Sequence, residues 1–298
     1  MKILPGTSFV SVMQVESPLQ LVGVTNSYHA LMAKTAGFKA LYLSGSGVAT
    51  ASYGLPDLGM TTLDNVLEDV RRITSASELP LLVDVDTGWG GAFMIARMMK
   101  EMDRAGAAGV HIEDQIQAKR CGHRPGKQLV STPEMCDRLK TAADAKEYDD
   151  FVLMARTDAI ASEGVDAAIE RSVAYVEAGA DMIFAEAVTE LSDFKKFKDA
   201  VTVPLLANLT EFGKTPAFTV EELASVSVDI ALYPLTVFRA ANKAAEKSLR
   251  VIRNEGTQQS VVGELQTRDE LYEYLEYHTY ESKLDDLFNA ESNDKSET

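Results

Sequence analysis

The sequence predicts an α/β protein that folds as a (β/α)8 barrel, the TIM-type fold, with extra helices at its C-terminal end. Eight short runs rich in β-branched and apolar residues recur along the chain, and segments with helical periodicity separate them. The runs follow one another at intervals of roughly 20 to 40 residues, a spacing typical of βα units and a parallel sheet. The length of 298 residues exceeds the roughly 250 typical of such a barrel by about one extra pair of helices.

Each predicted strand is a short apolar run that ends in polar residues. In chain order the strands are predicted at 19–26 (LQLVGVTN), 40–45 (ALYLSG), 81–88 (LLVDVDTG), 109–115 (GVHIEDQ), 151–158 (FVLMARTD), 181–187 (DMIFAEA), 204–210 (PLLANLT) and 229–235 (DIALYPL). Between them, 62–73 and 165–179 have apolar residues at helical spacing. Ser131, followed by Thr-Pro-Glu, is typical of a helix start, and Gly106 and Gly179 are typical of helix ends that need a left-handed residue.

The whole chain, 1–298, is predicted to form one domain. The barrel is expected over about 15–255, a helical extension over 256–290 and a disordered tail over 291–298, because the βα rhythm stops where the extension begins. Within the extension, 271–288 is rich in aromatic residues and is predicted to be a single amphipathic helix. A monomeric barrel does not need this helix, so we expect it to pack on another subunit.

The composition excludes several classes of function. The net charge of −16, from 29 basic and 45 acidic residues, leaves no basic surface for nucleic acid, so no nucleic-acid partner is expected. No apolar run reaches the ~18 residues that cross a bilayer, and the N-terminal segment is a poor signal peptide, so we expect a cytoplasmic protein with no membrane partner. The two cysteines, Cys121 and Cys136, provide no disulfide framework. We expect a metal ion and local arginines to capture any anionic substrate.

Polar residues stand at the C-terminal ends of the predicted strands, where barrel enzymes carry their active sites. Side chains alternate along a strand, so residues two apart share one face. The pairs that share a face in this way are Tyr42 and Ser44, Asp84 and Asp86, His111 and Glu113, Arg156 and Asp158, Phe184 and Glu186, and Asn208 and Thr210. One polar strand end is an ordinary loop junction, whereas many that converge on one mouth indicate a functional site.

The segment LLVDVDTG places two carboxylates, Asp84 and Asp86, at the end of an otherwise apolar strand. Two buried carboxylates repel each other and lose their hydration, and a divalent cation removes both costs. Mg²⁺ binds one or two protein carboxylates, keeps some waters and accepts substrate oxygens. The sequence therefore predicts a Mg²⁺ site on Asp84 and Asp86, with Glu113 of the next strand holding a metal-bound water. The alternative is that the aspartates cap the following helix.

Residues 119–127, KRCGHRPGK, follow the fourth strand and are too polar and glycine-rich for the core. Cys121 stands among cations, which favour the thiolate, so it is expected to be exposed and reactive with a lowered pKa. Gly122 and Gly126 favour a mobile lid over the site. The alternative is a basic surface loop with an incidental cysteine. Cys136 lies within a predicted helix and is expected to be structural.

Nine segments resemble the isocitrate lyase/phosphoenolpyruvate mutase superfamily in their order along the chain. They are LYLSGSGVA, GLPDLG, LLVDVDTG, HIEDQ, AKRCGHRPGK, MARTDA, FAEA, ANLTEFG and LYPLTVFRA. The resemblance extends over about residues 15–290, and KRCGH resembles the cysteine-loop signature of the lyase branch, which the mutase and phosphonopyruvate hydrolase branches lack. It implies a homotetramer, a dimer of dimers, in which the terminal helices swap between subunits.

The resemblance also implies a role for each matched residue. The implied metal ligands, for Mg²⁺ or alternatively Mn²⁺, are Asp84, Asp86 and, through water, Glu113. The implied catalytic residue is Cys121, and Tyr42, Asp57, Lys119 and His123 are further candidate catalytic residues. The implied substrate-binding residues are Ser44, Gly45, Ser46, Gly122, Arg156, Glu186, Asn208, Leu209, Thr210, Arg239 and Arg268. Ser46 stands where the family frequently has glycine.

The implied activity is Mg²⁺-dependent carbon–carbon cleavage of a small tricarboxylate, 2-methylisocitrate, to pyruvate and succinate in the methylcitrate cycle of propionate catabolism. In this retro-aldol (retro-Claisen-type) reaction Cys121 protonates the succinate carbanion. The base that removes the hydroxyl proton is expected to be Tyr42, which points into the mouth, or else Asp57.

Other activities remain open at this point. Phe184, Leu232 and Pro234 are the residue types that the resemblance associates with a methyl-bearing substrate. Isocitrate and 2,3-dimethylmalate are alternative substrates within the lyase branch. A phosphoenolpyruvate mutase or phosphonopyruvate hydrolase is a second alternative, and an oxaloacetate decarboxylase is a third. A catalytically inactive barrel that serves as a binding protein is the alternative from another class, because fold alone does not imply catalysis.

Overall fold

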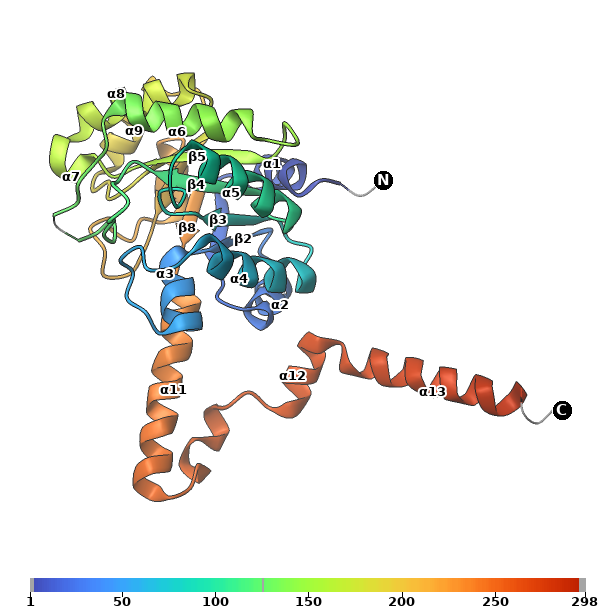
Figure 1. The fold of residues 1–298 in the computed structure, drawn as a ribbon. Coiled ribbons are helices and arrows are strands. Elements are labelled where there is room, and N and C mark those ends of the chain that lie inside the picture. Colours follow the sequence, from blue (N-terminus) through green and yellow to red (C-terminus); the bar gives the residue numbers. More distant parts are fainter. Residues whose placement is uncertain (1–2, 125, 295–298) are drawn as a thin grey trace. The chain divides into compact units, whose positions relative to one another are not determined.

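The computed structural model describes residues 3–124 and 126–294, and those residues contain a closed barrel of parallel strands (Figure 1). The strands follow one another around the barrel in sequence order, and β8 pairs with β1 to close it. The predicted (β/α)8 fold is therefore confirmed. The chain divides into two compact units, Met1–Ala240, which holds the barrel, and Ala241–Thr298. This division falls before the predicted limit of the barrel at about residue 255.

All eight predicted strands are present among the described residues, each shorter than its predicted run. They are β1 (Leu19–Gly23), β2 (Ala40–Leu43), β3 (Leu81–Asp84), β4 (Gly109–Glu113), β5 (Val152–Thr157), β6 (Met182–Ala185), β7 (Leu205–Asn208) and β8 (Ile230–Tyr233). The polar end of each run leaves the sheet and enters the loop that follows. The register pairs Asp84 with His111 and Glu113 with Arg156 on neighbouring strands, which gathers charged groups at one end of the barrel.

Helices connect the strands and form the outer layer of the barrel (Figure 1). Those of the first unit are α1 (Pro5–Val15), α2 (Ser27–Thr35), α3 (Gly45–Gly47), the π-helix η1 (Val48–Ser52), α4 (Leu63–Ala76), α5 (Ala92–Arg104), α6 (Thr132–Asp144), α7 (Ile160–Glu163), α8 (Val165–Glu177), α9 (Leu191–Ala200), α10 (Val220–Ser225) and the start of α11 (Thr236–Glu255). The helices predicted over 62–73 and 165–179 are confirmed as α4 and α8. Ser131 accepts the amide of Glu134 at 3.3 Å, and Gly106 and Gly179 have φ of 86° and 108°, so these predicted helix boundaries are also confirmed.

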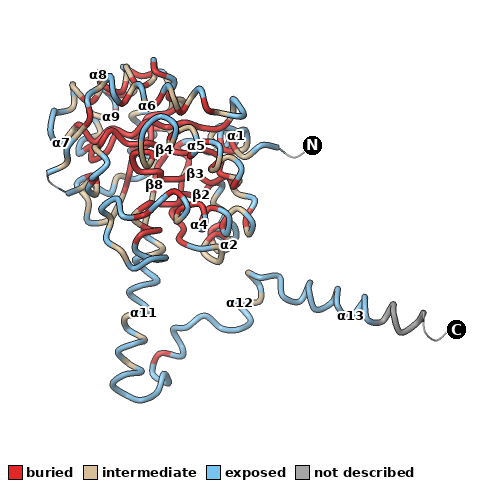
Figure 2. Tube along the Cα trace, in the orientation of Figure 1, coloured by how far each residue is buried: buried red, intermediate tan, exposed pale blue. Residues whose placement is uncertain are grey.

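The buried apolar residues form two layers, one inside the barrel and one between strands and helices. Figure 2 shows that the strands are the most continuously buried part of the chain. The layers arise because side chains alternate along each strand. Inside, Leu21, Leu82 and Met154 pack with Phe9 of α1. Gly6 of α1 lies against the backbone of Asp150, just before β5, so α1 covers the N-terminal ends of the strands. The C-terminal ends are left for a ligand.

The second unit is helical. It contains the rest of α11, the 3-10 helix η2 (Gln259–Glu264), α12 (Arg268–Leu275) and α13 (Tyr277–Asp294). The predicted single helix over 271–288 is wrong, because Glu276 adopts a left-handed conformation (φ 52°) that separates α12 from α13. The predicted disordered tail overlaps α13 up to Asp294 and otherwise lies outside the described residues. Within 3–124 and 126–294, no helix combines the length and apolar character needed to cross a membrane.

Candidate active site

The C-terminal ends of the strands enclose a cavity of about 300 Å³. The predicted convergence of polar strand ends on one mouth is confirmed, because the cavity is lined by side chains from most of the strands and the loops that follow them. Of the predicted site residues it brings together Tyr42, Ser44, Ser46, Asp57, Asp84, Lys119, Cys121, Gly122, His123, Arg156, Glu186, Asn208, Thr210 and Arg239.

The acidic pair, Asp84 and Asp86, lies at the end of β3. Asp86 adopts a left-handed conformation with φ of 49°, which aspartate tolerates better than most residues. The amides of Gly45 and Asp86 donate to the Asp84 carboxylate at 2.9 and 3.1 Å. A Cβ atom on Gly45 would lie 3.1 Å from both Asp84 Oδ2 and Asp86 Oδ1, so the two carboxylates converge beside this glycine. Gly45 thus keeps the space next to both oxygens free of a side chain.

Lys119 contacts the acidic pair from the cysteine loop (residues 119–127). Its Nζ lies 2.6 Å from Asp57 Oδ1 and 2.6 Å from Asp86 Oδ1, and its side chain is 4% exposed. Burial lowers the pKa of this ammonium, but the carboxylates around it, Asp86 first, raise the pKa well above its usual value. Burial raises the pKa of Asp86 to about 6. At Asp84 burial is outweighed by nearby nitrogen groups, His111 first, and the pKa is lowered.

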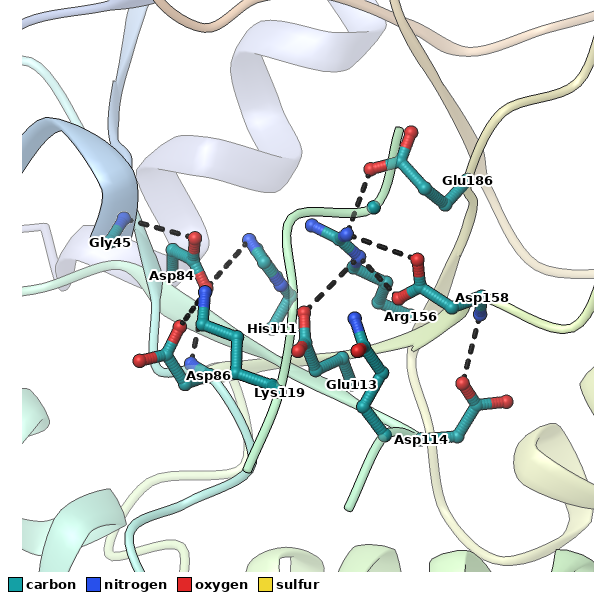
Figure 3. Close-up of polar contacts among 12 residues, drawn as sticks. Gly45, Asp84, Asp86, His111, Glu113, Asp114, Lys119, Arg156, Asp158 and Glu186 are labelled. Atoms are coloured by element: carbon teal, nitrogen blue, oxygen red, sulfur yellow. Dashed lines mark hydrogen bonds and ion pairs between the residues drawn. The ribbon is translucent and has the colours of Figure 1, made fainter. Parts of the chain in front are cut away.

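Arg156 of β5 joins three carboxylates in a second cluster (Figure 3). Its Nε lies 3.4 Å from Glu113 Oε2 and 3.0 Å from Asp158 Oδ2, and its Nη2 lies 3.0 Å from Glu186 Oε2. The guanidinium also lies 5.0 Å from the ring centre of Phe184. Burial raises the pKa of Glu113 well above its usual value. For Glu186, burial is outweighed by Arg156 and other nearby donors, which hold its pKa below the usual range.

Carboxylates outnumber the buried cations that contact them in this part of the described chain. Three cations, Lys119, Lys127 and Arg156, face six carboxylates, those of Asp57, Asp84, Asp86, Glu113, Asp158 and Glu186. Glu113 Oε1 is buried and has no hydrogen-bond partner among the described residues. Those residues contain no set of three or more His, Cys, Asp or Glu that forms a metal cage by itself, but Mg²⁺ needs only one or two protein carboxylates because it keeps several waters. The residues present therefore fit a hydrated divalent cation.

Tyr42 lies in the inner layer of the barrel and is one of the residues that line the cavity. Its hydroxyl is 2.9 Å from His111 Nε2, and the two rings stack at 5.7 Å. Burial lowers the pKa of His111 to about 4, so the imidazole is neutral. Burial and the charge of Asp84 raise the pKa of Tyr42 well above its usual value, so the phenol keeps its proton. The contact with His111 was not predicted, although His111 shares a strand face with Glu113.

Cys121 is partly buried in the cysteine loop, and burial raises the pKa of its thiol. The predicted lowering of this pKa is wrong because the thiol is partly buried and because two cations of the loop are engaged by carboxylates. Lys119 pairs with two aspartates, and Lys127 lies 2.7 Å from Asp158. The amide of His123 lowers the pKa but does not offset burial. The thiol therefore keeps its proton at neutral pH, which suits a proton donor.

His123 connects the cysteine loop to the wall formed by β6 and β7. Its Nδ1 accepts the amide of Lys214 at 3.0 Å, so in the neutral ring the proton is on Nε2, which lies 3.0 Å from Glu186 Oε1. Asn208 Nδ2 donates to both oxygens of Glu186 at 3.2 and 3.3 Å. Asn208 Oδ1 is buried without a partner among the described residues, so it can accept a hydrogen bond from a ligand.

Some predicted site residues do not line the cavity. Gly45, Asp86 and Glu113 are not among the residues that line it. Leu209 packs in the outer apolar layer with its amide bonded to the Leu232 carbonyl at 2.8 Å. Arg268 begins α12 in the second unit, so its role in substrate binding stays a prediction. Lining residues that the sequence did not predict are Arg124, Glu211, Phe212, Gly213 and Leu235. Glu211 directly follows the run predicted as the seventh strand, so extending that run by one residue would have found it.

Comparisons with known proteins place the chain in a family. The family model for phosphoenolpyruvate phosphomutase matches residues 9–253. The 2-methylisocitrate lyase of Escherichia coli (strain K12) is 61% identical over 285 residues, which cover 95% of this chain and 96% of that protein. The crystal structure of 2,3-dimethylmalate lyase is similar, with 31% identity, a TM-score of 0.87 and coverage of 94% of this chain and 95% of that one. The crystal structure of phosphonopyruvate hydrolase with oxalate and Mg²⁺ is also similar, with 28% identity, a TM-score of 0.82 and coverage of 94% of this chain and 98% of that one. The chain belongs to the phosphoenolpyruvate phosphomutase family, within the PEP mutase/isocitrate lyase superfamily.

Proposed function

We propose that the protein is a lyase that cleaves 2-methylisocitrate to pyruvate and succinate with a bound Mg²⁺ ion. The observation that carries this proposal is a single cavity in which the protonated thiol of Cys121, the guanidinium of Arg156 and the carboxylate of Asp84 meet. The relative from Escherichia coli, named for this reaction, is 61% identical, whereas the phosphonopyruvate hydrolase is 28% identical. The higher sequence identity to the lyase favours a lyase over the phosphonate enzymes. The charged and thiol side chains that line the cavity argue against a catalytically inactive barrel.

Asp84 and Asp86 would hold the Mg²⁺ ion, with Glu113 bound through a water. When bound, the ion supplies a Lewis acid for the hydroxyl group and adjacent carboxylate of the substrate. Two features support this assignment: the excess of buried carboxylates, and the unpaired oxygen of Glu113. Mn²⁺ is the alternative cation, because it accepts the same oxygen ligands.

Cationic and amide groups around the cavity would hold the carboxylates of the substrate. Arg156 and Arg239 of α11 both line the cavity, and Arg239 Nε lies 3.3 Å from Glu211 Oε2. Asn208 Oδ1 offers an acceptor for a hydroxyl group. These local contacts oppose the repulsion that the net charge of −16 exerts on an anionic substrate.

Cys121 would act as the acid of the reaction. When the C2–C3 bond breaks, its electron pair remains on the succinate fragment as an enediolate, and the thiol proton is transferred to that carbon. The thiolate then regains a proton from the base that deprotonated the hydroxyl group, so protons balance over the turnover. Acid–base catalysis by a well-placed group contributes about 10²–10⁴-fold.

Tyr42 and Asp57 are the two candidates for the base, and Tyr42 can serve only after its phenol, whose pKa is raised by burial, has lost its proton. The Tyr42 hydroxyl is hydrogen-bonded to His111, and Asp57 is paired with Lys119 beside the cysteine. Comparing Tyr42→Phe with Asp57→Asn separates them. The variant that lacks the base loses about 10²–10⁴-fold in single-turnover cleavage, whereas the other retains a rate close to that of the unmodified enzyme.

Within the lyases, the apolar part of the wall would rank the substrates. Pro234 lines the cavity, and Phe184 packs on Arg156 and meets the ring of His111 edge-on at 5.2 Å. Phe184 and Leu232 are fully buried in the inner layer and do not line the cavity, so of the three residues expected to rank substrates only Pro234 reaches it directly. One methyl group changes binding by about 1–3 kcal/mol, so isocitrate, which lacks it, would be a poorer substrate. 2,3-Dimethylmalate keeps this methyl group but lacks the third carboxylate, so it would lose a contact with the cationic groups of the cavity.

We also propose that the protein is a cytoplasmic homotetramer, a dimer of dimers. The second unit supports an assembly because it leaves large apolar side chains exposed, among them Leu249, Tyr280, Leu284, Leu287 and Phe288. Such side chains are covered at subunit interfaces. Light scattering should give four times the chain mass of 32.4 kDa, and a mass equal to one or two chains would contradict the tetramer.

The test of the proposed function is a substrate panel with product identification. The enzyme with Mg²⁺ should release pyruvate and succinate from 2-methylisocitrate faster than it releases glyoxylate from isocitrate or products from 2,3-dimethylmalate. A preference for one of the other two would reassign the substrate. Turnover of phosphoenolpyruvate or phosphonopyruvate alone would refute the lyase.

A further inference from the structure

Two side chains, Gln115 and Lys127, bind the backbone on either side of Cys121 and have no role in the mechanism above. Gln115 is completely buried; its Nε2 donates to the Arg120 carbonyl at 2.8 Å and its Oε1 accepts the Arg120 amide at 3.0 Å. Lys127 Nζ donates to the Gly122 carbonyl at 2.6 Å. The residues immediately before and after the cysteine are therefore each held by a side chain.

Both side chains are themselves fixed to the barrel. Gln115 follows β4, and its carbonyl accepts Arg138 Nη1 of α6 at 3.0 Å. The Lys127 side chain is 3% exposed, and its Nζ lies 2.7 Å from Asp158 Oδ1. Asp158 is fully buried, and its amide donates to Asp114 Oδ1 at 2.8 Å. Because Gln115 and Lys127 are both fixed in this way, the backbone of the cysteine loop is connected to the ends of two different strands, β4 and β5.

The segment between the two attachment points is also constrained. The Cys121 carbonyl accepts the amide of Arg124 at 2.9 Å, which closes a tight turn. A Cβ atom on Gly122 would lie 2.2 Å from Arg156 Nη2 and 2.7 Å from Glu186 Oε2, so the loop rests on that ion pair. Little freedom remains in the backbone of residues 120–122, and the position of the thiol depends on these contacts.

We propose that Gln115 and Lys127 are positioning residues that set Cys121 at the place from which its proton reaches the carbanion. The inference rests on the proposed lyase function. A displacement of about 1 Å at a reacting group costs roughly 10²-fold in rate, so loss of either attachment is expected to slow turnover to that extent. The two groups reach the loop through different partners, so each provides an independent test.

The first experiment compares Lys127→Met and Gln115→Met with a matched control. Lys146→Met is the control, because Lys146 is another largely buried lysine, paired with Asp181 at 2.5 Å and absent from the cavity lining. Both loop variants should lose about 10²-fold in kcat with little change in KM, and the control should match the unmodified enzyme. The same substitutions are then made in a Cys121→Ala background.

That background separates positioning of the thiol from a structural effect. If the two side chains act through Cys121, they cause no further loss of the residual turnover once the thiol is absent. If Lys127→Met and Gln115→Met lower the residual rate by the same factor as in the unmodified enzyme, they act elsewhere, for example through Asp158 and Arg156, and the inference is overturned. Near-normal kcat in both variants overturns it as well.

A second experiment needs no substrate and therefore does not depend on the proposed function. Iodoacetamide labelling is followed by peptide mass spectrometry, with Cys136 as internal reference. Release of the loop exposes the thiol, so Cys121 should be alkylated on the order of tenfold faster in both variants. Unchanged labelling in both variants would overturn the inference. Faster labelling in an enzyme that fails to cleave 2-methylisocitrate would refute the proposed function and leave the attachment of the loop standing.

Discussion

Replacing Gly122 by alanine tests how closely the cysteine loop must approach the Arg156–Glu186 ion pair. The added Cβ atom would lie 2.2 Å from Arg156 Nη2, whereas ordinary contact begins at 3.4 Å. Either the loop or the arginine must therefore move by about 1 Å, which corresponds to roughly a 10²-fold loss of rate. A loss of that size equals about 2.7 kcal/mol of transition-state stabilisation. The fold should survive, because the change lies in a loop at the surface of the cavity.

The assay is steady-state release of pyruvate from 2-methylisocitrate, with the thermal unfolding midpoint measured in parallel. Gly91→Ala is the matched control, because it adds the same atom in the barrel unit where no heavy atom lies within 4 Å and the φ of −78° is ordinary. We expect the control to retain its activity and Gly122→Ala to lose it with a similar unfolding midpoint. Activity of Gly122→Ala within twofold of the unmodified enzyme would refute the close approach.

Three further predictions follow from the site. Asp86→Asn removes one carboxylate of the acidic pair, so calorimetry should show weaker Mg²⁺ binding, and turnover at saturating substrate should fall. Unchanged Mg²⁺ binding would show that Asp86 is not a ligand of the metal. Burial raises the pKa of Cys121, and an acid is competent only while it is protonated, so kcat should stay constant through neutral pH and decline only above the ordinary pH range of thiol ionisation. If the same alkaline decline persists in Cys121→Ser, the thiol is not its source. Asp114 accepts hydrogen bonds from Thr157 at 2.7 Å and Tyr175 at 2.9 Å, so Asp114→Asn should lower the free energy of unfolding in urea by about 1–3 kcal/mol, and a change near zero would contradict a structural role.

The barrel could be predicted because its signals are local and repeated. Every strand is a compact apolar run, and helix boundaries such as Ser131 and Gly179 depend on the chemistry of one or two residues. The break between α12 and α13 has no such signal. It depends on a single left-handed residue, Glu276, inside a segment whose pattern suits a helix on both sides.

The residues of the site could be placed together from strand alternation, but their ionisation could not. Proximity in sequence suggested that the loop cations would lower the pKa of Cys121. In the folded chain Lys119 and Lys127 are neutralised by carboxylates from other loops, so burial decides the direction. The contact between Tyr42 and His111 joins residues from two strands and has no sequence signature of its own. Long-range pairing of this kind determines the chemistry and is visible only in three dimensions.

The most direct test of the central claim is product analysis in deuterium oxide with 2-methylisocitrate, in the presence of Mg²⁺ and again after chelation of the metal. Proton donation by an exchanged Cys121 thiol to the enediolate predicts equal amounts of pyruvate and succinate, with one deuterium in each succinate, and no reaction without the metal. Absence of pyruvate with Mg²⁺ present, or undiminished cleavage after chelation, would contradict the account.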